Sequence, residues 1–204
     1  MNYFIIRNKK MSWGDYGAIL FRGFLKVMDK KFNNLDTPEL ERIAPYIPDM
    51  YIANSRDLVI GDRVKNLFEE HRVTGIISYK EIKKKKIVRL DWENWDRASE
   101  LPQYIPSSGE PEDYIIKGKH DEMLAETLPN FWNPQIMEQK VLKVMSEKKN
   151  RENFSYLRLC ERPSVDIVCS LPRIIVSERL KNILEANKVD SVDLFPVEFL
   201  QDIE

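Results

Sequence analysis

The chain has 204 residues, of which 43% are apolar and 32% are charged, and 32 Lys and Arg against 33 Asp and Glu give a formal net charge of −1. This composition is typical of a globular protein with a hydrophobic core. It excludes a protein whose whole surface binds polyanions, because such proteins carry a clear basic excess. We expect a single domain over residues 1–204, with two halves, 1–97 and 117–204, joined by a Pro-rich loop as the alternative.

The hydropathy pattern contains no run of 18 or more apolar residues, so no membrane-spanning helix is expected. At the start of the chain, apolar residues 3–6 precede charged residues, the reverse of the order in a signal peptide. We therefore expect a cytoplasmic protein that does not bind membranes. In a reducing compartment, Cys160 and Cys169 are interpreted as buried thiols, with a disulfide between them as the alternative.

The first elements in chain order are a strand and an uncertain segment. Residues 3–7 predict a strand, whereas residues 16–32 are ambiguous because Gly17 and Gly23 interrupt an apolar run. The sequence Asp-Thr-Pro-Glu at residues 36–39 predicts the start of a short helix that stops before Pro45.

An internal repeat follows, in which residues 57–79 match residues 173–195 at an offset of 116 without a gap. In each copy an apolar run leads to a helix-capping residue, Gly61 or Ser177, and apolar residues then recur at i, i+3 and i+4. Each copy therefore predicts a strand, a helix and a strand, within units of about residues 50–82 and 166–199. The identical pairs are Arg63/Arg179, Lys65/Lys181, Asn66/Asn182, Glu69/Glu185 and Val73/Val189. Their polar members suit either a solvated helix face or a shared binding surface.

Between the two copies the character of the chain changes. Lys83, Lys84, Lys85 and Lys86 predict a charged hairpin turn or an edge strand blunted by lysines, with a phosphate-binding patch as the alternative. Residues 98–116 contain three prolines and predict a loop. Asn133 and Pro134 predict the start of a helix, with its apolar stripe at Met137, Val141, Val144 and Met145.

Catalytic groups are not placed by any motif of this sequence. Neither a nucleotide-binding fingerprint nor a hydrolase motif occurs, and His71 and His120 are interpreted as exposed polar residues. Asp91 and Glu93, two apart on a predicted strand, could point the same way and bind a metal, but no third ligand is placed. We expect no enzyme, cofactor or metal, with a metal-dependent hydrolase or nuclease, or a nucleic-acid-binding protein using residues 83–86, as alternatives.

A partner-binding surface is suggested by aromatic and acidic residues in the middle of the chain. Trp92 and Trp95 stand beside acids and a Pro-rich stretch, where tryptophans are often partly exposed and anchor interfaces; alternatively, they cover the edge of the core. Residues 107–138 hold seven acids and two bases, an excess of five negative charges. The candidate partner-binding residues are Trp92, Trp95, Glu110, Glu112, Asp113, Asp121 and Glu122.

The second copy of the repeat also carries a resemblance to a family. Residues 174–184, an aliphatic run entering a Ser-Glu-Arg-Leu helix, and residues 192–197, Val-Asp-Leu-Phe-Pro-Val, resemble the C-terminal signature of immunity proteins from bacterial polymorphic-toxin systems. Gly61 replaces the serine in the first copy, and residues 98–150 have no counterpart in the signature. The resemblance implies a small cytosolic α+β protein without enzymatic activity that binds a cognate toxin encoded beside it and blocks the toxin's active site.

These observations predict an α+β fold with a mixed or antiparallel sheet, a few helices and two similar strand-helix-strand units in one compact body. The predicted function is that of an immunity protein. The acidic region suits a toxin whose groove is basic, such as a nuclease, because complementary charge speeds association. Binding of nucleic acid itself is not expected.

Overall fold

The computed structural model describes residues 2–29, 31–54, 56–149 and 152–198, so Phe199, where the second predicted unit ends, lies outside the described residues. The helices are α1 (Asp15–Arg22), α2 (Asp62–Glu70), α3 (Asp113–Lys117), α4 (Glu122–Thr127) and α5 (Glu178–Ala186), with a 3-10 turn η1 (Trp92–Asn94). The strands are β1 (Tyr3–Asn8), β2 (Phe24–Met28), β3 (Asn34–Ala44), β4 (Met50–Ile52), β5 (Leu58–Gly61), β6 (Ile76–Arg89), β7 (Phe131–Ile136), β8 (Leu142–Lys149), β9 (Glu152–Leu159), β10 (Ile167–Ser170), β11 (Arg173–Ser177) and β12 (Val192–Val197).

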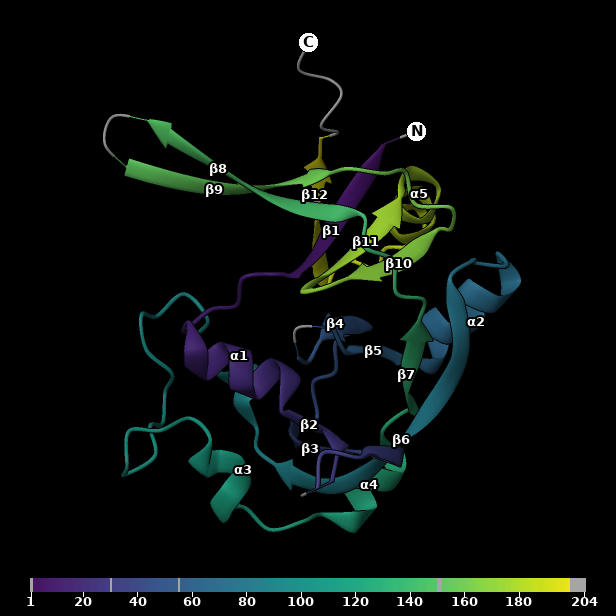
Figure 1. Ribbon diagram of the computed structural model, residues 1–204. Coiled ribbons are helices and arrows are strands. Elements are labelled where there is room, and N and C mark those ends of the chain that lie inside the picture. Colours follow the sequence, from purple (N-terminus) through teal and green to yellow (C-terminus); the bar gives the residue numbers. More distant parts are fainter. Residues whose placement is uncertain (1, 30, 55, 150–151, 199–204) are drawn as a thin grey trace.

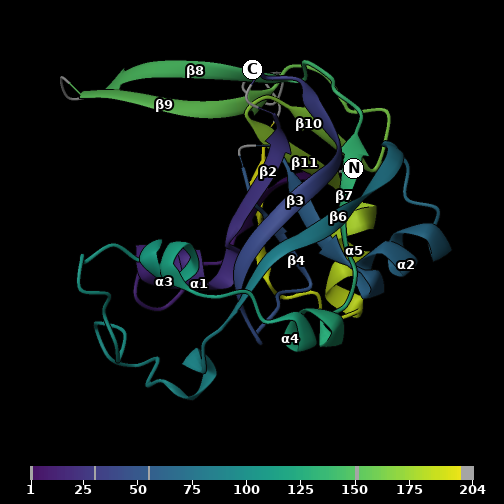
Figure 2. The same cartoon turned by 90° about the horizontal axis from the view of Figure 1, so that it is seen from below.

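The strands form two main sheets and a separate hairpin, which confirms the predicted α+β class (Figure 1). The larger sheet has the order β2-β3-β6-β7-β5-β4; β3 and β6 run parallel, and its other neighbours run antiparallel. The smaller sheet is antiparallel, with the order β10-β11-β1-β12. The hairpin of β8 and β9 extends away from both sheets as an arm (Figure 2).

The two predicted strand-helix-strand units are confirmed as β5-α2-β6 and β11-α5-β12. Gly61 and Ser177 are the N-caps of the two helices, and the Ser177 hydroxyl accepts the N–H of Leu180 at 3.2 Å. Just past the helix ends, the equivalent residues Arg72 and Lys188 both have left-handed backbone, with φ of 49° and 55°. The units therefore agree in backbone conformation as well as in sequence.

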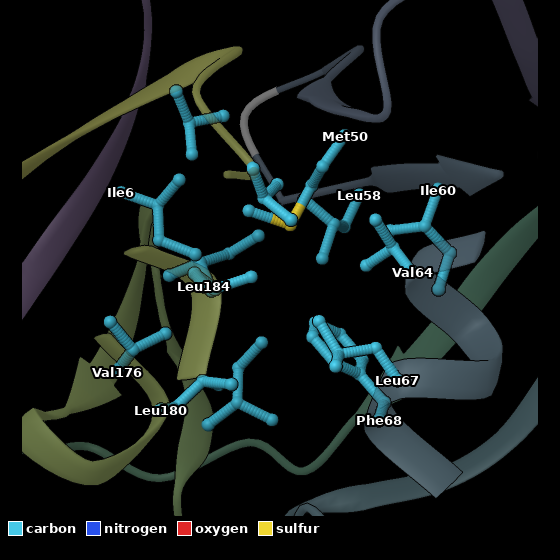
Figure 3. Packing of buried hydrophobic residues seen from close by; sticks show 14 residues of the cluster. Ile6, Met50, Leu58, Ile60, Val64, Leu67, Phe68, Val176, Leu180 and Leu184 are labelled. Carbon is cyan, nitrogen blue, oxygen red and sulfur yellow. The ribbon is translucent and has the colours of Figure 1, made fainter. Parts of the chain in front are cut away.

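The apolar faces of the two repeat helices pack into one shared core (Figure 3). Val64 and Phe68 of α2 lie in the same buried cluster as their equivalents in α5, Leu180 and Leu184. Each such buried side chain contributes about 1.5–3 kcal/mol of apolar transfer free energy. The spacing that predicts these helices is therefore also what joins the two units.

The strands of the two halves cross over between the sheets. β1 precedes the first unit in the chain but pairs with β11 and β12 of the second, whereas β7 precedes the second unit but pairs with β5 and β6 of the first. The registers agree, because Phe4 faces Val176 and Trp132 faces Ile60, the equivalent residue at the offset of 116. Each half thus supplies its first strand to the sheet of the other.

Two expected helices are strands in the structure. Residues 36–39 belong to β3, where a register shift in the pairing with β2 falls between Lys26 and Met28 and lets Pro38 sit without a regular ladder position. Asn133 and Pro134 belong to β7, and the buried Asn133 amide donates to the Leu58 carbonyl at 2.9 Å instead of capping a helix. A polar residue before a proline predicts the start of a helix, but here Pro38 and Pro134 both lie inside sheet strands.

The lysine run lies in a strand and not in a turn. Residues 83–86 belong to β6, which is continuous from Ile76 to Arg89. β7 pairs with β6 over Ile76–Ile82, and β3 pairs with it from Lys83 onward, so the lysines have a neighbouring strand on one side. The hairpin-turn interpretation is therefore wrong, whereas the pairing agrees with the edge-strand interpretation for this part of β6.

Candidate partner-binding surface

Trp92 and Trp95 lie inside the molecule, so the expectation that they are partly exposed is wrong. Trp92 is fully buried and Trp95 is 7% exposed, in a cluster with Trp13 and Tyr46. The ring centroids of Tyr46 and Trp92 are 5.3 Å apart, and those of Trp13 and Trp95 are 5.9 Å apart. The alternative interpretation, that these tryptophans cover an edge of the core, describes them better.

The aromatic cluster holds the Pro-rich loop against the body. Trp95 contacts the ring of Tyr104 at a centroid distance of 5.6 Å. The Trp13 indole N–H donates to the Ser99 hydroxyl at 3.3 Å, and the Tyr16 hydroxyl donates to the Gly109 carbonyl. The loop therefore has a defined path along one end of the molecule.

The five acidic candidates divide by what their carboxylates contact. Glu110 and Glu122 are exposed, whereas Glu112 is half-buried and one of its oxygens has no partner among the described residues. Asp113 pairs with Lys117 at 2.5 Å and accepts from Ser108, and these contacts lower its pKa. Only Glu110 and Glu122 are thus fully free for a partner among these five.

Asp121 has a structural role at the start of α4. Its carboxylate accepts the N–H of Leu124 at 2.9 Å as the helix N-cap, and it pairs with Arg89 at 2.7 Å. The hydrogen bond from Leu124 and the contact with Arg89 lower the pKa of Asp121. The Asp121 carboxylate therefore stabilises α4 and is already engaged in contacts within the protein.

Two lysines of β6 hold the short helices of this region. Lys84 donates to the carbonyl of Leu128, the C-cap of α4, and Lys86 donates to the carbonyl of Ile116 near the end of α3, both at 2.9 Å. A cation at a helix C-terminus also meets a favourable helix dipole. Lys83 and Lys85 alternate with them and are exposed. Half of the lysine run therefore anchors the acidic segment.

The outer side of this segment carries apolar residues that the sequence analysis did not select. Among the residues that the structure describes, ten large apolar side chains are exposed, and half of them lie between residues 101 and 123. We define the loop surface as these five together with the exposed acids around them: Leu101, Tyr104, Ile105, Ile116, Met123, Glu100, Glu110, Glu122 and Glu126. In Figure 1 the segment that carries them runs along the bottom of the molecule, past α3 and α4. In the sequence, the feature that could have predicted this surface is the presence of apolar residues in and just after the Pro-rich stretch.

The residues proposed for metal binding do not form a site. Asp91 and Glu93 are not on a strand, since Asp91 caps the turn η1 and accepts the Asn94 amide at 2.8 Å. Over the described parts of the chain, no three His, Cys, Asp or Glu side chains gather in a way that could hold a metal ion. His120 is exposed, as expected, and its Nδ1 accepts the N–H of Ile87 at 2.9 Å, while His71 is half-buried.

The repeated arginines bind across the two units. Arg63 pairs with Asp49 and donates to the carbonyl of Asn187 at 2.9 Å. Arg179 pairs with Asp166 at 2.6 Å and donates to the carbonyl of His71, the position equivalent to Asn187. These reciprocal contacts give the two shared arginines an internal role.

The cysteines differ in exposure. Cys169 is buried and Cys160 is exposed, and both are free thiols, so the interpretation as two buried thiols is wrong for Cys160. Burial raises the pKa of the Cys169 thiol.

A comparison with protein-family models and with curated proteins finds no match to this chain. None of the helices within the described residues is long and apolar enough to cross a membrane. The residues that carry the resemblance to immunity proteins, among them Ile174, Val176 and Leu180, are buried in the core.

Proposed function

We propose that this protein is a cytoplasmic immunity protein that binds a cognate toxin domain through the loop surface and neutralises it. The observation that carries the proposal is the loop surface itself, where exposed apolar side chains stand among acids on a segment fixed to the body. Such apolar residues rimmed by charge are typical of protein-binding sites. Fixing the segment in advance also reduces the ordering cost of association.

The charge of the loop surface favours a basic partner. Its four acids, Glu100, Glu110, Glu122 and Glu126, are exposed and outnumber the two exposed bases of the same segment, Lys117 and Lys119. Lys117 is also paired with Asp113. An acidic surface of this kind attracts a basic groove and raises the association rate at low salt. A nuclease-type toxin domain fits this description, since its groove must bind phosphates.

The test uses the toxin domain encoded beside this protein, with co-expression to measure rescue of growth and calorimetry to measure affinity. The double substitution Tyr104→Ala with Ile105→Asp is expected to weaken binding by about tenfold or more, because central apolar anchors carry most of an interface's energy. The control is Phe32→Ser, which removes a more exposed ring outside the loop surface and is expected to leave binding unchanged.

The outcomes separate the function from the surface. Failure of the unmodified protein to bind or to rescue growth would contradict the proposed function. Binding that is unaffected by the double substitution would leave the function in place but contradict the assignment of the loop surface.

A further inference from the structure

A basic hollow lies on a different part of the molecule, lined by residues from the end of β1, the end of α1, β4 and the turn between β10 and β11. Figure 1 shows these elements near the centre of the view. Its volume is about 490 Å³, within the range of small-molecule sites. Arg7, Arg22 and Arg173 line it, and none of its lining residues is an acid. We refer to it as the arginine hollow.

The three guanidinium groups of the arginine hollow have donors to spare. Within the described residues, no carboxylate lies within 4.0 Å of any of them. Asp193 stands opposite Arg7 in the β1–β12 register, but the Arg7 guanidinium lies over the Phe195 ring, 4.7 Å from its centroid. Arginines without an acidic partner around one hollow favour an anionic ligand.

Arg22 and Arg173 make long hydrogen bonds to backbone carbonyls. Arg22 donates through Nε to Ala18 at 3.3 Å, and Arg173 donates through one terminal nitrogen to Pro172 at 3.3 Å. The Nε of Arg173 is buried without a hydrogen-bond partner, so this nitrogen does not itself contact a ligand in the hollow. Neither arginine is neutralised by these contacts, because a carbonyl carries no net charge.

A second hollow adjoins the first and shares Asn8 and Arg22 with it. It has a volume of about 340 Å³, and its lining adds Lys9 and Lys10 but again no acid. Met11 gives it an apolar wall, together with Ala18 and Phe21 of α1. Five basic residues and no acid therefore line two adjacent hollows in a chain whose net charge is −1.

We propose that the arginine hollow binds a phosphate-bearing small molecule of about nucleotide size. The planar guanidinium fork matches the oxygens of a phosphate, and arginines from three separate elements can surround a chain of phosphates. The adjoining hollow, with its apolar wall, receives the uncharged part of the ligand. This site shares none of the residues of the loop surface, so it stands apart from toxin binding.

The test measures binding of ATP, pyrophosphate, adenosine and a short single-stranded RNA by calorimetry, with thermal melting as a second readout. We expect ATP to bind more tightly than pyrophosphate and adenosine not to bind. The double substitution Arg22→Gln with Arg173→Gln is expected to weaken ATP by about tenfold per arginine. Arg72→Gln is the control, because it removes one arginine charge from an exposed position just past the end of α2, outside both hollows.

Several results would overturn the proposal. The first is that ATP does not bind at millimolar concentration, and the second is that pyrophosphate binds as tightly as ATP. The third is that RNA binds more tightly than ATP with a steep salt dependence, which would indicate a nucleic-acid site instead. An unchanged affinity in the double variant would also overturn it. If that variant does not fold, the single substitution Arg7→Gln on the exposed side chain of β1 serves instead, with an expected loss of about tenfold.

Discussion

Asp166 is a buried carboxylate whose hydrogen bonds join the two repeat units. It accepts the backbone N–H and the hydroxyl of Thr74 at 3.0 and 2.9 Å, the hydroxyl of Ser177 at 2.9 Å and the guanidinium of Arg179. Burial alone would raise its pKa, but the hydrogen bonds from Thr74 and Ser177 and the charge of Arg179 outweigh burial and lower the pKa below 3.8. The charged form therefore stabilises the fold.

Because the pKa of Asp166 is lower in the folded state, its contribution is complete above about pH 3.8 and is lost as the pH falls through the folded value. We expect Asp166→Asn to reduce the free energy of unfolding by about 2–4 kcal/mol at neutral pH and by less in acid. Urea unfolding at both pH values measures this. The equivalent but more exposed Asp49 is the control, and Asp49→Asn is expected to cost about 1 kcal/mol or less. Equal losses for the two variants would contradict the prediction.

The repeat identified Arg63 and Arg179 from the sequence but not their partners. Asp49 lies 12 residues before Gly61 (61 − 49 = 12), whereas Asp166 lies 11 before Ser177 (177 − 166 = 11). An ungapped alignment therefore does not bring the two acids together, although both pair with the equivalent arginine. The choice of the seven candidate partner-binding residues failed for a similar reason. Composition shows that the segment is rich in acids, but it does not show which of these acids cap helices or pair internally.

At the scale of elements, α2 and α5 could be predicted because their capping residue and apolar spacing lie within one short segment. β3, β6 and β7 could not, because what makes them strands is the neighbour with which each is paired. The lysines of β6 illustrate this, since their charge suggested a solvent-exposed turn while two of them are satisfied by the ends of helices distant in sequence.

The anchoring of α3 and α4 by lysines can be tested with a matched pair of variants. We expect Lys84→Met with Lys86→Met to speed amide exchange in α3 and in α4 by about fivefold each, because each helix loses one hydrogen bond worth about 1 kcal/mol. Lys83→Met with Lys85→Met removes the same charge from the same strand and is expected to leave exchange unchanged. Similar exchange in both variants, measured by mass spectrometry, would show that charge alone matters.

At the scale of the whole molecule, a cut in the Pro-rich loop breaks no strand or helix, yet the two pieces remain interlocked. A protease site inserted between Ser107 and Ser108 would give one piece that contains β1 and another that contains β7. Because each sheet then includes a strand of the other piece, we expect the cut protein to elute as one species and to separate only after denaturation. Separation under native conditions, on gel filtration, would contradict this.

The sequence reveals the repeat but not this crossing, since local patterns say that a segment is a strand and not which sheet receives it. Lys65 lies 4.8 Å from the ring centroid of Trp132, and Lys181 lies 5.4 Å from that of Phe4. The equivalent lysines thus each contact the strand that their own unit receives. Such cross-unit pairs become visible only when both units are seen together.

The crossing of β1 and β7 has a consequence for the origin of the chain. Two copies of a half-length protein that exchanged their first strands would form a symmetric domain-swapped dimer. Joining the two copies end to end would reproduce the connectivity seen here in a single polypeptide. The arms between the exchanged strand and the rest of each copy would then be free to diverge, one into α1, β2 and β3, and the other into the β8–β9 hairpin. The present molecule has the topology of a fused pair whose two members still hold each other's first strand.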